Sequence, residues 1–213
     1  MNCPLCFSSH HRVFEIDQKR SYLLCQHCSL VFVPRDQLIN DEDEKKRYEL
    51  HDNSETNFDY KNYLENTAHL VHSFLKKGST GLDFGCGITR ILENSLKEKG
   101  HEVFSYDKFF LPDDSVFENN YDFIILSEVI EHLKKPFEDL MRLTPLLHED
   151  GLIFVKTKLR PENPEKFKNW FYKRDVTHVQ FFSDCSFEHL SNTLQLTKAI
   201  QIDRDLFLFR NNR

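Results

Sequence analysis

Two glycines one residue apart, flanked by acids, are the residues of this chain whose types and spacing most clearly fit chemistry. Asp83-Phe84-Gly85-Cys86-Gly87 follows the apolar Leu82, and Asp107 comes twenty residues after Gly87. Glycine lets the backbone turn sharply and approach a ligand closely, while an acid at the end of the next strand can bind both hydroxyls of a ribose. The spacing therefore predicts a βαβ unit that binds an adenosine-containing cofactor.

The residues around the glycines distinguish between adenosine cofactors. A dinucleotide fingerprint has a third glycine three residues after the second, which lets helix and strand pack around a pyrophosphate. Here Gly87 is followed by Ile88-Thr89-Arg90. Asp83 would repel a phosphate, but it suits a ligand that carries an ammonium or sulfonium cation. We therefore expect S-adenosylmethionine as the cofactor.

Three segments in the expected order resemble the class I S-adenosylmethionine-dependent methyltransferases. Residues 83–87 resemble motif I, residues 121–133 (YDFIILSEVIEHL) resemble the motif at the end of strand four, and residues 146–155 look like the turn into strand five. The resemblance covers residues 56–213 and implies an α/β fold with a Rossmann-like sheet of seven strands, the last antiparallel. It also implies that Asp83 reaches the methionine end of the cofactor and Asp107 the ribose. Thr89 departs from the family pattern, which most often has a third glycine there.

Positions that match these motifs give the expected cofactor contacts. They are Asp83, Phe84, Gly85, Cys86, Gly87, Tyr106, Asp107, Lys108, Phe109, Ser127 and Glu128. We expect Phe109 or Phe110 to lie against the adenine ring, although core packing explains either side chain equally well.

Hydrophobic spacing predicts the elements that position these residues. Residues 60–77 have an apolar face with helical period, residues 88–99 form the helix after the glycines, and residues 101–106 form a strand that ends at Asp107. Open α/β sheets bind ligands at the carboxyl ends of their strands. The short connection between Asp107 and the next strand leaves Val116-Phe117 as the candidate for strand three.

Four of the six cysteines form two CxxC pairs, Cys3/Cys6 and Cys25/Cys28, separated by eighteen residues. Two such turns facing each other supply the tetrahedral thiolate set that zinc prefers. Short strands are predicted around them at 12–16, 22–24 and 30–33. We predict a structural zinc ribbon over residues 1–36, whose folding energy the metal supplies because its core is small. A disulfide pair and a redox CxxC are the alternatives.

Composition bounds the class of function. The 213 residues carry a net charge of −6 and are 39% hydrophobic, which fits one α/β domain with a small appendage. Residues 1–36 contain four basic against three acidic residues, and four thiolates with Zn²⁺ would make them slightly acidic. A nucleic-acid clamp is usually more basic. Residues 37–55 hold the charged block 41–47 and are expected to be a linker or an exposed helix start before the domain at 56–213.

The chain begins without a basic segment and apolar run, and no stretch approaches the roughly 20 apolar residues of a membrane span. We therefore expect a cytoplasmic protein that does not bind membranes.

Methyl transfer from a sulfonium is an in-line displacement that needs alignment and timely deprotonation of the acceptor. Glu128, Glu131 and His132 are spaced to share a helix face after strand four, and His178 lies in an aromatic and charged stretch, 170–183, where the family places its substrate loop. We predict His178 as the general base, with His132 and Glu131 as further catalytic residues. Structural roles explain both histidines equally well.

The set Glu128-x-x-Glu131-His132 with a later histidine also resembles the divalent-metal site of the small-RNA 3′-end 2′-O-methyltransferases and a similar set in ubiquinone-pathway O-methyltransferases. A second metal that activates neighbouring hydroxyls is therefore a further alternative.

Together these features predict a methyltransferase for a small-molecule or sugar-like acceptor. A zinc ribbon ahead of such a domain resembles the deoxysugar C-methyltransferases. RNA methylation is the alternative, because ribosomal-RNA guanine methyltransferases also carry an N-terminal zinc module. A non-catalytic zinc-ribbon interaction protein is a further alternative, but the intact set Asp83, Gly85, Gly87 and Asp107 argues against it.

Overall fold

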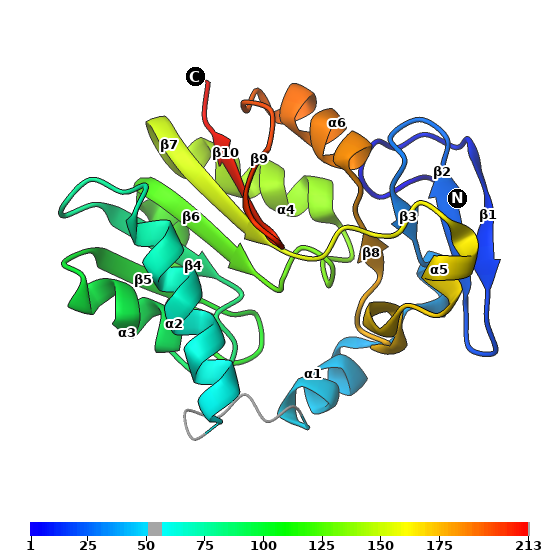
Figure 1. The fold of residues 1–213 in the computed structure, drawn as a ribbon, viewed down its shortest axis with the longest axis horizontal. Coiled ribbons are helices and arrows are strands. Elements are labelled where there is room, and N and C mark those ends of the chain that lie inside the picture. Colours follow the sequence, from blue (N-terminus) through cyan, green and yellow to red (C-terminus); the bar gives the residue numbers. More distant parts are fainter. Residues whose placement is uncertain (51–56, 213) are drawn as a thin grey trace.

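Two β-sheets organise the chain in this computed structural model, which describes residues 1–50 and 57–212 (Figure 1). The smaller sheet has the order β1-β2-β3-β8, and the larger has the order β5-β4-β6-β7-β10-β9. Among the described residues, no helix is both long enough and apolar enough to cross a membrane.

The smaller sheet joins three N-terminal strands to a strand from much later in the chain. Its antiparallel strands are β1 (His11–Ile16), β2 (Ser21–Cys25), β3 (Val31–Phe32) and β8 (Gln180–Phe181). The first three match the strands expected around the cysteines, whereas β8 comes about 150 residues later in the chain. Phe14 and Tyr22 share a buried cluster with Phe167, Tyr172 and Phe181. Residues 1–36, which we call the cysteine module, are therefore packed against residues 167–181 and share their core.

The larger sheet is mixed. It contains β4 (Thr80–Phe84), β5 (Glu102–Tyr106), β6 (Tyr121–Ser127), β7 (Leu147–Lys156), β9 (Ile200–Asp203) and β10 (Leu206–Arg210). Strand β4 is parallel to β5 and β6, and β6 is parallel to β7, whereas β10 is antiparallel to both β7 and β9. The expected antiparallel last strand is confirmed.

The predicted sheet of seven strands is corrected to six for the described part of the chain. The segment proposed for strand three forms a 3₁₀ helix, η2 (Asp114–Glu118), instead. Val116 turns into the core, and its carbonyl accepts a hydrogen bond of 2.7 Å from the Tyr121 hydroxyl. The connection is too short for a helix and a strand, so β5 stays at the edge of the sheet.

Helices cover both faces of the large sheet (Figure 1). On one face lie α2 (Phe58–His72) and α3 (Ile91–Glu98), and on the other lie α4 (Pro136–Leu143) and α6 (Asp184–Leu194). Along β6, Phe123 and Ile125 pack in the cluster with α2 and α3, whereas Ile124 and Leu126 pack in the cluster with α4. This alternation is the two-residue period of a strand covered on both sides.

Three further elements lie beside the carboxyl ends of the parallel strands or next to the small sheet. They are α1 (Asp41–Glu49), α5 (Pro164–Lys168) and the 3₁₀ turn η4 (Phe171–Arg174). Helix α1 occupies the charged block that sequence analysis expected to be a linker or helix start. The Asn40 side chain caps α1 by accepting from the Asp43 N–H at 2.9 Å. Residues 51–56 of the expected linker lie outside the described residues.

Candidate active site

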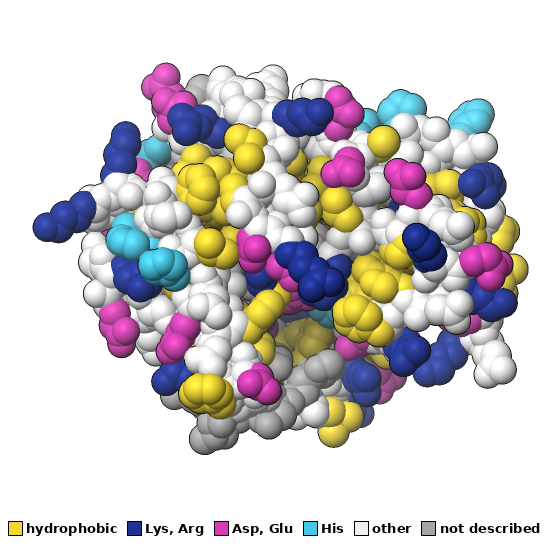
Figure 2. Space-filling view, viewed as in Figure 1, with side chains coloured by type: hydrophobic (Ala, Val, Ile, Leu, Met, Phe, Trp, Pro, Cys, Tyr) yellow, Lys and Arg dark blue, Asp and Glu magenta, His cyan; other side chains and the backbone are white. Residues whose placement is uncertain are grey.

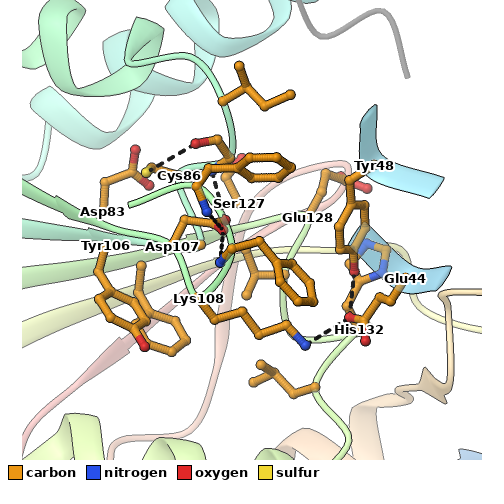
Figure 3. Close-up of a pocket in the computed structure, with 18 of the residues that line it drawn as sticks. Glu44, Tyr48, Asp83, Cys86, Tyr106, Asp107, Lys108, Ser127, Glu128 and His132 are labelled. Atoms are coloured by element: carbon orange, nitrogen blue, oxygen red, sulfur yellow. Dashed lines mark hydrogen bonds and ion pairs between the residues drawn. The ribbon is translucent and has the colours of Figure 1, made fainter. Parts of the chain in front are cut away.

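A cavity of about 800 Å³ lies at the carboxyl ends of β4, β5 and β6. Its lining comes from these strand ends, from α1 and from the segment 171–178 that follows α5. Figure 2 shows a hollow near the middle of the molecule, bordered by charged side chains, and Figure 3 shows the cavity residues at close range. Ligands bind at this edge of open α/β sheets.

The glycine turn is held against the end of β5. Gly85 and Gly87 have φ angles of 81° and 69°, which favour glycine. The N–H groups of Gly85 and Cys86 both donate to the Tyr106 carbonyl, at 2.7 and 3.1 Å. A Cβ atom at Gly85 would lie 2.5 Å from a methyl carbon of Val129. Glycine at position 85 therefore serves both the backbone angle and close packing under the cavity.

Asp107 connects the ends of two neighbouring strands (Figure 3). One carboxylate oxygen accepts from the Gly87 N–H at 3.0 Å, and the other accepts from the N–H groups of Phe109 and Phe110 at 2.8 and 3.0 Å. These bonds fix the carboxylate where it lines the cavity. A carboxylate oxygen has two lone pairs, so the oxygen bonded to Gly87 keeps one with which it can accept a ribose hydroxyl.

Asp83 is 3% exposed and lines the same cavity. Burial, together with the negative charges of Glu93 and Asp107, raises the pKa of Asp83 to about 7. A cation bound beside Asp83 would favour its ionised form. The site thus suits the positively charged methionine end of the expected cofactor.

Glu128 is held by two tyrosines that the sequence did not single out. Tyr63 on α2 donates to one carboxylate oxygen at 2.6 Å, and Tyr172 in η4 donates to the other at 3.0 Å. The Tyr172 hydroxyl also hydrogen-bonds with Glu131. Helical spacing marked the neighbourhood of Tyr63 only as a core face, because a buried hydroxyl leaves no trace in hydrophobic periodicity.

Glu131, which is predicted to be a catalytic residue, is not among the residues that line the cavity. It is fully buried, and its backbone carbonyl accepts from the N–H groups of Val179 and Gln180 at 2.9 and 3.0 Å. Burial and the charge of Glu128 raise the pKa of Glu131 well above its usual range. A neutral Glu131 can donate its proton to the Tyr172 oxygen while Tyr172 donates to Glu128.

His132 and His178 come together at the cavity, with ring centroids 4.6 Å apart. The Nδ1 atom of His132 lies 3.1 Å from the Thr177 carbonyl, and the Nδ1 atom of His178 lies 2.6 Å from the Tyr172 carbonyl. Because a carbonyl only accepts, each Nδ1 carries a proton, and the lone pair of the neutral ring is on Nε2. Burial lowers the pKa of His178. The arrangement suits a neutral base.

The predicted second metal site is partly assembled. Ligand atoms of Glu131, His132 and His178 lie within 4.8 Å of one another, whereas Glu128 is outside this group. The Glu131 Oε2 atom is buried and has no hydrogen-bond partner among the described residues. Such a set could hold a divalent cation.

All the other predicted cofactor residues also line the cavity. They are Phe84, Cys86, Tyr106, Lys108, Phe109 and Ser127, together with Phe110. The Ser127 hydroxyl oxygen is buried without a hydrogen-bond partner in the described chain, so a ligand that offers a polar atom there would satisfy it.

Helix α1 covers part of the cavity, a position that its charged sequence did not reveal. Glu44 is 2% exposed and forms an ion pair with Lys108 at 3.0 Å (Figure 3). It forms a second ion pair with Lys134 at 2.8 Å. Tyr48 donates to Glu44 at 3.0 Å. Two lysines from beside the cofactor residues thus tie α1 to the sheet.

Cys3, Cys6, Cys25 and Cys28 form one cluster with sulfur atoms within 4.8 Å of one another. The Cys3–Cys28 and Cys6–Cys25 sulfurs are 3.6 and 3.4 Å apart, and all four cysteines are free. Four sulfurs at about 2.3 Å from a tetrahedral zinc would be roughly 3.8 Å apart. Both turns end in a left-handed residue four positions after the first cysteine, Phe7 and Ser29. The donor set fits zinc.

The six-stranded mixed sheet and the glycine turn at its ligand edge define an α/β protein that binds a nucleotide-like cofactor. Residues 56–199 match the family described as a methyltransferase domain. The chain therefore belongs to this methyltransferase family and is an S-adenosylmethionine-dependent enzyme. A search of curated proteins gives no significant match.

Several solved structures share the fold. A 1,6-didemethyltoxoflavin-N1-methyltransferase from Burkholderia thailandensis, with S-adenosylhomocysteine bound, is 14% identical with a TM-score of 0.59, covering 96% of this chain and all of its own. The plantazolicin methyltransferase BpumL, also with S-adenosylhomocysteine, is 18% identical with a TM-score of 0.53 and covers 82% and 92%. An S-adenosylmethionine-dependent methyltransferase from Archaeoglobus fulgidus is 20% identical with a TM-score of 0.51 and covers 66% and 71%. These likenesses describe the fold.

Proposed function

We propose that this methyltransferase acts on a small molecule. The observation that carries the proposal is the cavity of about 800 Å³, partly covered by α1 and by residues 171–178. Pockets for small ligands have volumes of about 300–1,000 Å³, and this one must take both the methyl donor and the acceptor. A folded RNA would need a wider opening and a more basic surface than a chain of net charge −6 provides.

The cofactor would bind along the strand ends. Asp107 would hold a ribose hydroxyl, and Asp83 with Glu128 would face the cationic methionine end. Gly87 leaves room for the ligand beside the turn, because a Cβ atom at this position would meet nothing within 4 Å. When bound, the cofactor supplies the methyl group as an electrophile. The contribution of the chain is to align the acceptor and to take its proton, a role we assign to His178 with His132 beside it.

The cysteine cluster would hold one structural zinc ion. Four thiolates complete a tetrahedral shell, so no position would stay open for catalysis. The support is the single cluster formed by both CxxC turns and the shared core with residues 167–181. The metal would thereby stabilise the segment that carries Tyr172 and His178.

Calorimetry with S-adenosylhomocysteine tests the cofactor site. We expect saturable binding that Asp107→Ala weakens at least tenfold, since charge-assisted hydrogen bonds contribute about 1.5–3 kcal/mol. The control Asp203→Ala removes an exposed acid on β9 and should bind as the wild type does. Radiolabelled methyl transfer to a metabolite extract, and not to RNA, is the expected outcome for the acceptor class. Equal affinity of Asp107→Ala and wild type would contradict the proposed site, and labelling of RNA alone would contradict the small-molecule acceptor.

A further inference from the structure

Five rings form a continuous wall on the cavity, which we call the ring wall: Tyr48, His132, His178, Tyr172 and Phe171. Successive ring centroids are 5.3, 4.6, 4.1 and 6.1 Å apart. All five residues line the cavity, and they come from three separate segments of the chain. Tyr48 and His132 lie side by side in Figure 3, away from the glycine turn. The fold thus gathers these aromatic rings on one wall of the cavity.

The polar atoms of the ring wall are largely occupied by the protein itself. The hydroxyl of Tyr48 donates to Glu44 at 3.0 Å, and that of Tyr172 donates to Glu128 at 3.0 Å. The Nδ1 atoms of His132 and His178 face backbone carbonyls. The wall therefore offers an acceptor mainly ring faces and ring edges. A sugar needs a partner for each of several hydroxyls, whereas a flat aromatic molecule is satisfied by such contacts.

Phe171 adds a second indication. Its side chain is 59% exposed at the end of the ring wall, although it is large and apolar. Core packing does not account for a ring in this position, because more than half of it is in contact with solvent. An aromatic ligand that extends along the wall would cover it.

The base in the wall favours the same class of acceptor. A neutral imidazole removes a proton more readily from an acid that is not far weaker than the imidazolium it forms. An aromatic hydroxyl has a pKa near 10, as in tyrosine, whereas an aliphatic alcohol is a much weaker acid. Ring N–H groups of electron-poor heterocycles are acidic in the same way. His178 can therefore serve an aromatic O–H or N–H without help from a metal.

We propose that the acceptor is a planar aromatic or heteroaromatic molecule, methylated on a ring-attached O–H or ring N–H while it lies against the ring wall. This inference rests on the proposed function and specifies its substrate class. The acceptor proton goes to Nε2 of His178. The bond that forms joins the acceptor oxygen or nitrogen to the methyl carbon, the sulfur–methyl bond breaks, and the sulfur keeps the electron pair. No oxidant or reductant is consumed.

The test uses the full-length protein saturated with S-adenosylhomocysteine and two probes of similar size. 2-Naphthol is flat and aromatic, whereas decahydro-2-naphthol has the same carbon skeleton without the aromatic rings. We expect 2-naphthol to bind roughly three to ten times more tightly, the scale of aromatic pairing. Tyr48→Leu and Phe171→Leu should each remove most of this preference and leave the affinity for S-adenosylhomocysteine unchanged. Phe74→Leu, a half-exposed phenylalanine outside the cavity, is the matched control.

The possible results test the aromatic acceptor and the cofactor site separately. Normal binding of S-adenosylhomocysteine with equal or absent binding of both probes overturns the aromatic acceptor but leaves the methyltransferase site intact. An aromatic preference that survives in both wall variants also overturns it. Failure of the wild type to bind S-adenosylhomocysteine overturns the cofactor site on which the inference rests. If Tyr48→Leu loses cofactor binding, Phe171→Leu still tests the preference for the aromatic probe, because Phe171 is exposed.

Discussion

Arg20 donates a hydrogen bond of 2.9 Å to the Lys173 carbonyl, across the contact between the cysteine module and the segment that carries Tyr172 and His178. The same guanidinium donates to the carbonyls of Asp175 and Val176, at 2.9 and 2.8 Å. In return, Lys173 forms ion pairs with Glu15 at 2.7 Å and Asp17 at 3.0 Å. The β1–β2 hairpin therefore fixes the backbone of the segment that carries His178, the proposed base.

Arg20→Met should loosen this contact without disturbing the cofactor residues. Arg20 is 8% exposed, and its side chain would lose four hydrogen bonds, three to carbonyls and one to the Tyr22 hydroxyl. Their loss should lower the free energy of unfolding by at least about 3 kcal/mol. Carbethoxylation of His178, followed by peptide mass spectrometry, should become several times faster. The affinity for S-adenosylhomocysteine should stay within twofold of the wild type. Arg12→Met, an exposed arginine on β1, is the matched control and should change neither quantity.

An unchanged rate of His178 modification in Arg20→Met would show that the hairpin does not position the segment. If this variant loses cofactor binding and fails to fold, Arg20→Lys supplies a milder test. One ammonium group cannot replace a planar guanidinium that donates to three carbonyls at once.

Metal removal should act through the same contact. We expect about one zinc per chain, and chelation should unfold residues 1–33 because their own core is small. Since β3 pairs with β8, amide exchange should also accelerate at residues 171–181. Cys28→Ser should reproduce this effect, whereas Cys185→Ser changes an exposed cysteine and should retain the metal. A chain that keeps its protected amides after losing the metal would contradict a structural zinc.

Alanine substitutions at two glycines with nearly the same φ angle can separate the effect of backbone strain from that of a steric collision. Gly85 and Gly78 have φ angles of 81° and 77°, but a Cβ atom at Gly78 would meet nothing within 4 Å. Gly78→Ala should therefore cost only about 1 kcal/mol of stability and keep cofactor binding. Gly85→Ala adds the collision with Val129 and should weaken binding of S-adenosylhomocysteine at least tenfold. Equal behaviour of the two variants would mean that the turn is not shaped for the ligand.

Whether a site residue can be predicted from the sequence depends on whether local or long-range interactions fix its position. Asp83, Gly85, Gly87 and Asp107 line one cavity, and the sequence predicts this grouping because backbone geometry and charge demand those residue types at that spacing. The short connection after Asp107 already indicates that a further strand has little room there. By contrast, β8 joins the cysteine sheet through backbone bonds between segments about 150 residues apart, and two residues carry no pattern of their own.

Side-chain partnerships were the hardest to predict. Glu44 is buried on a helix whose sequence is almost entirely charged, because two lysines from distant segments neutralise it. The sequence of α1 itself gives no indication of these two lysine partners. Tyr63 looked like core for a similar reason, since its ring lies on the apolar face of α2 while its hydroxyl serves Glu128.

The raised pKa of Asp83 predicts how cofactor binding depends on pH. A carboxyl whose pKa rises from its usual 3.8 to about 7 on folding favours the protonated form. Its contribution to stability is therefore complete below pH 3.8 and is lost as the pH rises through 7, by about 4 kcal/mol at most. Without ligand, Asp83→Asn should become more stable relative to the wild type as the pH rises from 5 to 8.

The ammonium group of S-adenosylhomocysteine should reverse this preference by favouring the ionised carboxylate. Binding near pH 6 should then release a proton, and affinity should increase as the pH approaches 7. Calorimetry in two buffers with different ionisation enthalpies measures the proton directly. In Asp83→Asn the observed enthalpy should lose this dependence on buffer; a wild-type enthalpy independent of buffer would place the cation elsewhere.

Tyr63→Phe tests whether Glu128 must be held in place to serve the cofactor. The variant removes a bond of 2.6 Å to a carboxylate and leaves the ring that covers Lys156. A carboxylate that loses a donor is less well fixed, so affinity for S-adenosylhomocysteine should fall about tenfold, the scale of one hydrogen bond to a charged group. Tyr121→Phe removes a buried hydroxyl bonded to the Val116 carbonyl, far from the glycine turn, and should reduce stability by a similar amount while leaving affinity unchanged. If both variants lose stability alone, Tyr63 is a core residue and Glu128 does not depend on it.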